Sequence, residues 1–106
     1  MSIVSPKKDS YMDEEVVKAL RKNKAVLVKK FGVKSLALFG SCARGTANDD
    51  SDVDVLIMFD GPATSERYFG AQFYLEDLLG KPVDLVTETA VRPELRPYIE
   101  RDRVDV

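Results

Sequence analysis

The chain has 106 residues, of which 44% are hydrophobic and 32% are charged, and its formal net charge is −2. This length and composition predict one globular domain. The mildly acidic balance argues against direct binding to nucleic acid, whose backbone is usually gripped by a basic surface. The sequence holds no histidine. This excludes histidine-based metal sites and general bases, and leaves the carboxylates as candidates for such chemistry.

The N-terminal residues, the apolar runs and the single cysteine indicate the cellular compartment of the protein. Residues 1–10 are polar, and we expect them to be a flexible end before a single domain over residues 11–106. No apolar run approaches the roughly 20 residues that span a bilayer, and residues 1–10 lack the apolar stretch of a secretory signal. The single cysteine, Cys42, fits a reducing compartment. We therefore expect a cytoplasmic protein with no membrane partner.

The first elements follow from apolar periodicity. Residues 13–30 predict an amphipathic helix, whose acidic start and basic end suit the helix dipole. Its apolar face consists of Val16, Leu20, Leu27 and Phe31. Gly32 is a natural end for this helix. A short strand is expected over residues 35–39, and a short helix over residues 41–47.

The second half of the chain alternates strands and helices. A strand over residues 52–59 is apolar on both faces beyond its aspartates, which favours a central place in a sheet covered by helices. A helix is expected over residues 65–79, a third strand over residues 82–87 and a last helix within residues 93–102. Together these elements predict an α+β fold, a layered arrangement of helices on a small sheet.

The helix over residues 65–79 is rich in aromatic side chains. We expect Phe69 and Phe73 to lie in the core, because aromatic residues at helical spacing usually pack inward. Any aromatic side chains left exposed could form a surface for a partner.

The most informative stretch, residues 36–58, holds a Gly-Ser pair followed after ten residues by Asp-x-Asp. Gly40 lets the backbone approach a phosphate closely, and Ser41 adds a hydroxyl. Asp52 and Asp54 alternate along a strand, so they point to the same face about 7 Å apart. Two such carboxylates repel each other unless a cation lies between them, and Mg²⁺ takes ligands of this kind. Exposed, solvated aspartates are the alternative.

Two further charged residues are candidates for the same site. Asp84 interrupts an apolar strand, and a carboxylate there needs a metal ion, a partner or solvent. If the third strand lies beside the second, Asp84 can join the Asp-x-Asp pair; otherwise it is an aspartate that faces water. Arg44 could give bidentate contacts to a phosphate or form a structural ion pair with Asp49 or Asp50. Both readings of Arg44 stay open.

The spaced motif resembles a known signature. It consists of Gly40-Ser41, then Ala43-Arg44-Gly45 within the spacer, then Asp52-x-Asp54. This pattern resembles the DNA polymerase β-like nucleotidyltransferase superfamily, and within it the minimal nucleotidyltransferase group of small prokaryotic proteins. Many members of that group are antitoxins paired with a HEPN-domain toxin. The resemblance covers about residues 35–106 and implies a small mixed sheet with catalytic aspartates on adjacent strands.

The resemblance also implies an activity. It is the Mg²⁺-dependent transfer of AMP from ATP to a hydroxyl, that of a tyrosine on the HEPN toxin. The implied catalytic and metal-binding residues, which would hold two ions, are Asp52, Asp54 and Asp84. The implied phosphate-binding residues are Gly40, Ser41 and Arg44. Asp84 would also help to activate the attacking hydroxyl.

Two other functions fit the same motif. A non-catalytic antitoxin would neutralise its toxin by contact alone, and it would still do so without the aspartates. A small-molecule nucleotidyltransferase of the aminoglycoside-resistance type shares the motif, but such enzymes generally carry a further domain that helps to build the acceptor pocket. The short segment that follows the third predicted strand leaves little room for one.

Overall fold

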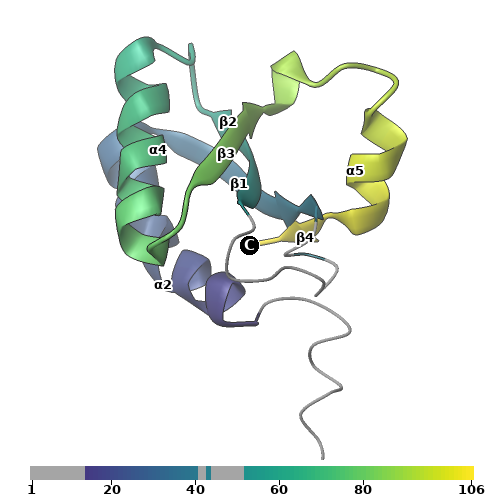
Figure 1. Ribbon diagram of the computed structural model, residues 1–106. Coiled ribbons are helices and arrows are strands. Elements are labelled where there is room, and N and C mark those ends of the chain that lie inside the picture. The colour runs from purple at the N-terminus through teal and green to yellow at the C-terminus, as the bar shows by residue number, and fades with distance from the viewer. Residues whose placement is uncertain (1–13, 41–42, 44–51) are drawn as a thin grey trace, which may run out of the picture.

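The computed structural model describes residues 14–40, 43 and 52–106. In chain order the elements are α2 (Glu14–Phe31), β1 (Val33–Phe39), β2 (Val53–Phe59), α4 (Ser65–Leu79), β3 (Val83–Thr87), the 3-10 helix η1 (Glu88–Ala90), α5 (Arg96–Asp102) and β4 (Val104–Asp105) (Figure 1). The predicted α+β class is confirmed. The expected flexible end over residues 1–10 lies outside the described residues, as does most of the helix expected over residues 41–47.

The strands form one mixed sheet in the order β3-β2-β1-β4. Strand β1 runs antiparallel to both β2 and β4, whereas β2 and β3 are parallel. Parallel neighbours need a crossover connection, and α4 provides it between β2 and β3. The predicted central position of β2 is confirmed, since it has a neighbour on each side.

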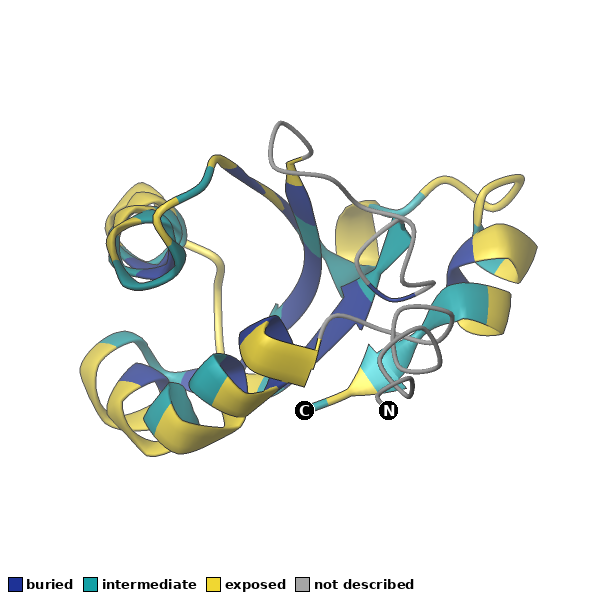
Figure 2. Ribbon diagram, turned by 60° about the horizontal axis from the view of Figure 1, so that its bottom comes forward, coloured by how far each residue is buried: buried dark blue, intermediate teal, exposed yellow. Residues whose placement is uncertain are grey.

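One face of the sheet is covered by α2 and α4, which lie together in Figure 1. The side chains between these layers form the main core, and the dark blue segments in Figure 2 trace it. Its fully buried members include Leu20 and Leu27 of α2, Leu38 of β1, Ile57 of β2 and Leu75 of α4. Burial of a Leu or Ile side chain contributes about 1.5–3 kcal/mol, so this face dominates the stability of the fold.

The opposite face of the sheet carries a smaller cluster. Ala37 of β1, Leu56 of β2 and Ile99 of α5 are buried there. Partly buried Phe39, Val86 and Val91 pack around them. Alternation along the strands explains this division, because Ala37 and Leu56 lie between residues that point into the main core.

Helix α4 begins and ends where the sequence predicted, at Ser65 and Leu79. The hydroxyl oxygen of Thr64 accepts a hydrogen bond from the Arg67 amide at 3.2 Å, which caps the first turn. Gly80 follows the last turn with φ +68°, and its amide donates to the Glu76 carbonyl at 2.8 Å.

The expected burial of Phe69 and Phe73 is wrong. Their exposed fractions are 50% and 64%, whereas Ala71 and Leu75 of the same helix are fully buried. Each helical residue turns the direction of the side chain by about 100°, so a side chain two positions before a buried one points roughly away from it. The small alanine and the leucine face the sheet, and the two phenylalanines therefore face outward.

Of the last three elements, α5 lies within the range predicted for a last helix, whereas η1 and β4 were not predicted. The two-residue strand β4 pairs with β1, placing Asp105 opposite Ala37 and Val104 opposite Leu38. The 3-10 helix η1 also has no apolar period of its own. Among the helices in the described part of the chain, none is long and apolar enough to cross a membrane.

Candidate active site

Two of the predicted aspartates face each other across neighbouring strands. Asp54 of β2 and Asp84 of β3 are direct partners in the parallel register. Neighbouring strands lie about 4.8 Å apart, and paired positions point to the same face of the sheet. The residues on either side of them, such as Val53 and Val83, point into the main core. Both carboxylates therefore lie on the face that α2 and α4 leave open.

Asp52 lies one residue before β2 and is exposed, as is Asp84, while Asp54 is half-buried. The predicted aspartates thus gather at the amino-terminal ends of the two parallel strands. Among the described residues, Asp52 and Asp84 are open to solvent at this end of the sheet.

Gly40 closes the same site from the end of β1. The preceding residue, Phe39, pairs with Asp54, which brings the turn against that carboxylate. Gly40 has φ +73°, and a Cβ atom built on it would collide with the Asp54 carboxylate. Glycine is therefore required both by the backbone conformation and by the lack of space. The other predicted phosphate-binding residues, Ser41 and Arg44, lie outside the described residues.

The carboxylates fit a hard divalent cation such as Mg²⁺ by donor type and by strand register. Such an ion takes one or two carboxylates and completes its shell with water and phosphate oxygens. Within residues 14–40, 43 and 52–106, however, no group of three or more acidic or cysteine side chains is close enough to hold a metal ion. The register makes Asp54 and Asp84 a pair, and a joint role with Asp52 stays a prediction.

Helix α4 holds the outer edge of β3 on both sides of Asp84. Gln72 Nε2 donates to the Val83 carbonyl at 3.0 Å, and the Val83 amide donates to Glu76 Oε2 at 3.0 Å. The Tyr68 hydroxyl donates to the carbonyl of Leu85. Burial, and then the nearby charge of Asp84, raise the pKa of Tyr68, so this hydroxyl keeps its proton. These side chains satisfy the free edge of β3 and fix the strand that carries Asp84.

A cavity of about 210 Å³ opens beside Gly40, between the end of β1 and α5. Its lining consists of Phe39, Gly40, Leu95, Tyr98, Ile99 and Asp102. The guanidinium of Arg101 lies over the Tyr98 ring, 5.4 Å from its centroid, which restrains this side chain at the mouth. This cavity could not be predicted from the sequence, because the mixed charges near the C-terminus look like an ordinary solvated surface.

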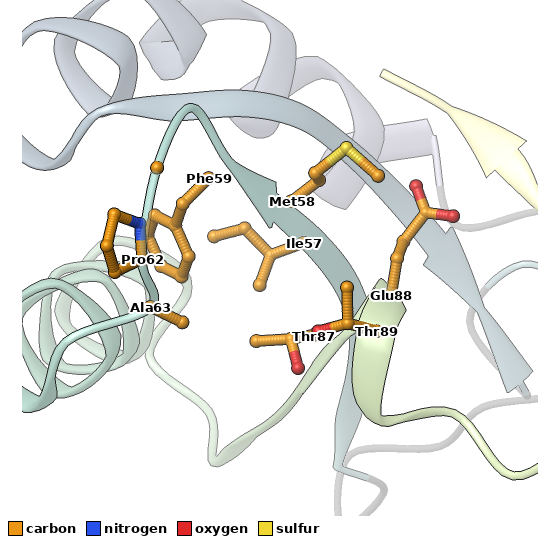
Figure 3. A pocket seen from close by; sticks show the side chains of 9 residues that line it. Ile57, Met58, Phe59, Pro62, Ala63, Thr87, Glu88 and Thr89 are labelled. Carbon is orange, nitrogen blue, oxygen red and sulfur yellow. The ribbon is translucent and has the colours of Figure 1, made fainter.

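A second cavity, of about 310 Å³, lies at the carboxyl ends of β2 and β3. Figure 3 shows Ile57 and Phe59 on one side of it and Thr87, Glu88 and Thr89 on the other. The aspartates lie at the amino ends of the same strands, so this cavity is not part of the carboxylate site. We assign the candidate active site to the carboxylates, because Asp54 and Asp84 are paired on neighbouring strands and Gly40 approaches Asp54 closely.

Most of the chain matches a known family. Residues 20–106 match the model of the nucleotidyltransferase domain. The chain belongs to this family. It is therefore a nucleotidyltransferase, an enzyme, and Gly40, Asp54 and Asp84 lie within the matched region.

Two relatives cover nearly the whole chain. A protein of Methanocaldococcus jannaschii, named provisionally as a protein adenylyltransferase, is 43% identical over 96 residues, which are 87% of this chain and 95% of the relative. The protein adenylyltransferase MntA of Thermococcus cleftensis is 37% identical over 93 residues, which are 88% of this chain and 94% of the relative. The matched region makes up nearly the whole length of both relatives.

Solved structures share the fold. A structure described provisionally as a minimal nucleotidyltransferase has a TM-score of 0.75 at 36% identity, covering 92% of this chain and 99% of its own. A toxin–antitoxin crystal structure with AMP-PNP has a TM-score of 0.63 at 22% identity, covering 88% of this chain and 70% of its own. The mixed sheet and its helices are therefore the minimal nucleotidyltransferase fold.

Proposed function

We propose that this protein transfers AMP from ATP to a hydroxyl of a HEPN-family toxin in the cytoplasm, and so acts as the antitoxin of the pair. The observation that carries the proposal is the register of Asp54 against Asp84, with Gly40 closing on Asp54. The names of the relatives, protein adenylyltransferase and MntA, support the same activity.

In this proposal the hydroxyl oxygen of the acceptor attacks the α phosphorus of ATP in line. The bond to the bridging oxygen breaks, pyrophosphate leaves with the bonding electrons, and Asp84 accepts the hydroxyl proton. Gly40 leaves the backbone free to approach the phosphates, which Ser41 and Arg44 also bind. The chain then contributes mainly position and charge, since phosphoryl-type transfer depends on these more than on covalent catalysis.

Asp52, Asp54 and Asp84 would hold Mg²⁺, in a two-ion site according to the family resemblance. Once bound, the metal would neutralise the charge that develops on the phosphates. The acceptor that we propose is a tyrosine, and the family resemblance supports this choice. Modification of the toxin would silence it.

Intact mass measurement tests the proposal directly. The HEPN protein from the same genome is incubated with this chain, ATP and Mg²⁺, and fragmentation then locates any added AMP. We expect one or more AMP masses on a tyrosine, and none with Asp52→Ala/Asp54→Ala. Glu94→Ala, an exposed acid outside the site, is the matched control and should retain transfer.

Two results would contradict the proposal. AMP transfer by the double aspartate variant would show that the carboxylates are not the metal site. Neutralisation of the toxin by both forms, without any change in mass, would assign the protein to the non-catalytic antitoxins.

A further inference from the structure

The outer face of α4 carries an aromatic ridge that the fold itself does not need. The rings of Phe69 and Phe73 are stacked, with centroids 6.4 Å apart and an interplanar angle of 27°. Tyr68 meets Phe69 edge to face at 5.2 Å. The inner face of the helix is already filled by Ala71 and Leu75, which are fully buried. Among the described residues, none buries the two phenylalanines.

Exposed acids stand at both ends of the ridge. Glu66 lies three residues before Phe69, and Asp77 lies four residues after Phe73, so all four residues follow one side of the helix. The stripe from Glu66 to Asp77 is about 16 Å long at 1.5 Å per residue. The one arginine of α4, Arg67, is engaged elsewhere, because it pairs with Asp60 at 3.0 Å. The ridge is thus an apolar centre between two negative ends.

This charge pattern disfavours a second copy of the chain as the occupant. In an antiparallel pairing of two α4 helices, Glu66 of one copy would lie opposite Asp77 of the other. In a parallel pairing each acid would lie opposite itself. Like charges across an interface are unfavourable in both cases, so pairing of α4 with α4 of a second copy is disfavoured and a complementary surface carries basic residues.

We propose that this face of α4 is the docking surface for a helix of the HEPN toxin that presents two apolar side chains between lysine or arginine residues. The identity of that partner rests on the proposed function, whereas the chemistry of the helix follows from the ridge. An amphipathic helix in an apolar groove or on an apolar ridge is a common mode of recognition. Docking here leaves Asp54 and Asp84 accessible, because they lie on the opposite face of the sheet.

Binding measurements with the purified HEPN protein test the surface. We expect Phe69→Ser/Phe73→Ser to raise the dissociation constant at least about tenfold, since aromatic anchors dominate interface energies. Glu66→Lys/Asp77→Lys keeps the rings, and it should weaken binding and reverse its dependence on salt. Val26→Ser/Val28→Ser on α2 is the matched control, because these valines are 38% and 45% exposed. It should bind like the unmodified chain.

The same samples separate this proposal from the proposed function. Unchanged binding by both α4 variants, with AMP still added to the toxin, would overturn the docking surface alone. Weakened binding by the α4 variants, while the unmodified chain adds no AMP, would support the surface and overturn the enzymatic proposal. Failure of the unmodified chain to bind would overturn both. Self-association that is lost in Phe69→Ser/Phe73→Ser would assign the ridge to a second copy and overturn the proposal.

Discussion

At Gly40 the backbone conformation and the candidate active site both require a residue without a Cβ atom. Its φ of +73° is one that residues with a Cβ atom rarely adopt, and a Cβ atom there would collide with the Asp54 carboxylate. The sequence predicted a close approach to a phosphate at this position. The structure adds a close approach to a catalytic candidate, which the sequence could not reveal because Phe39 and Asp54 meet only through strand pairing.

Substitution of Gly40 by alanine should therefore affect both stability and activity. The positive φ costs about 1–2 kcal/mol for a residue with a Cβ atom, and displacement of Asp54 should lower AMP transfer by about a hundredfold. Gly80→Ala is the matched control, because Gly80 has φ +68° with nothing within 4 Å of a built Cβ atom. Urea unfolding and initial transfer rates compare the two variants. Equal rates in both would show that the contact with Asp54 has no catalytic consequence.

At the scale of elements, the sequence predicted what local signals encode. The bounds of α4 are marked by Thr64 and Gly80, and the central place of β2 is marked by its apolar faces. The outward direction of Phe69 was missed because both faces of α4 are rich in apolar residues, so periodicity alone could not choose between them. Strand β4 was missed because two residues show no alternation.

The register of Asp54 with Asp84, in contrast to the bounds of α4, is not encoded by local signals. From the sequence it was a condition: the aspartates meet only if the third strand lies beside the second. Strand order depends on contacts between distant segments, which a sequence pattern does not show. In the structure β3 lies at one edge of the sheet beside β2, and β4 lies at the other edge. The structure supplies this order, and with it the geometry of the candidate site.

The hydrogen bonds from α4 to β3 predict a positioning role for two side chains. Gln72→Ala/Glu76→Ala removes both contacts with the Val83 backbone, so the strand that carries Asp84 should loosen. We expect a loss of about 1–3 kcal/mol in the free energy of unfolding, together with faster hydrogen exchange at the Val83 amide. Asp77→Ala, an exposed residue of the same helix, should change neither quantity. Unaltered exchange at Val83 would show that β2 alone holds the strand.

At the scale of the whole molecule, the sheet separates two tasks. The face under α2 and α4 holds the main core, and the other face carries the aspartates and the cavity beside Gly40. A rigid core behind the candidate active site would keep reacting groups in place, as the proposed positioning mechanism requires. The edges of the sheet are also protected, since α4 side chains cover β3 and β4 covers β1.

The protection of β1 can be tested by removing residues 104–106. This change deletes the pairing of β4 with β1, and with it the bond from the Val106 amide to the Leu36 carbonyl at 3.0 Å and from Lys24 Nζ to the Val106 carbonyl at 2.7 Å. We expect the free energy of unfolding to fall by about 2–4 kcal/mol, because each hydrogen bond contributes about 0.5–1.5 kcal/mol. Urea unfolding measures the loss.

Arg103→Ala distinguishes the contribution of the β4 strand to stability from that of the ion pairs around it. Arg103 pairs with Asp105 at 2.7 Å and with Glu88 at 3.5 Å, but Asp105 is largely exposed. The pair with Asp105 is open to solvent and contributes about 0–1 kcal/mol, whereas the side chains of Arg103 and Glu88 are only 21% and 15% exposed. We expect Arg103→Ala to lose less stability than the truncated chain, because it leaves the pairing of β4 with β1 in place. An equal loss in the two would mean that Arg103, rather than the β4 ladder, attaches the end of the chain to the sheet.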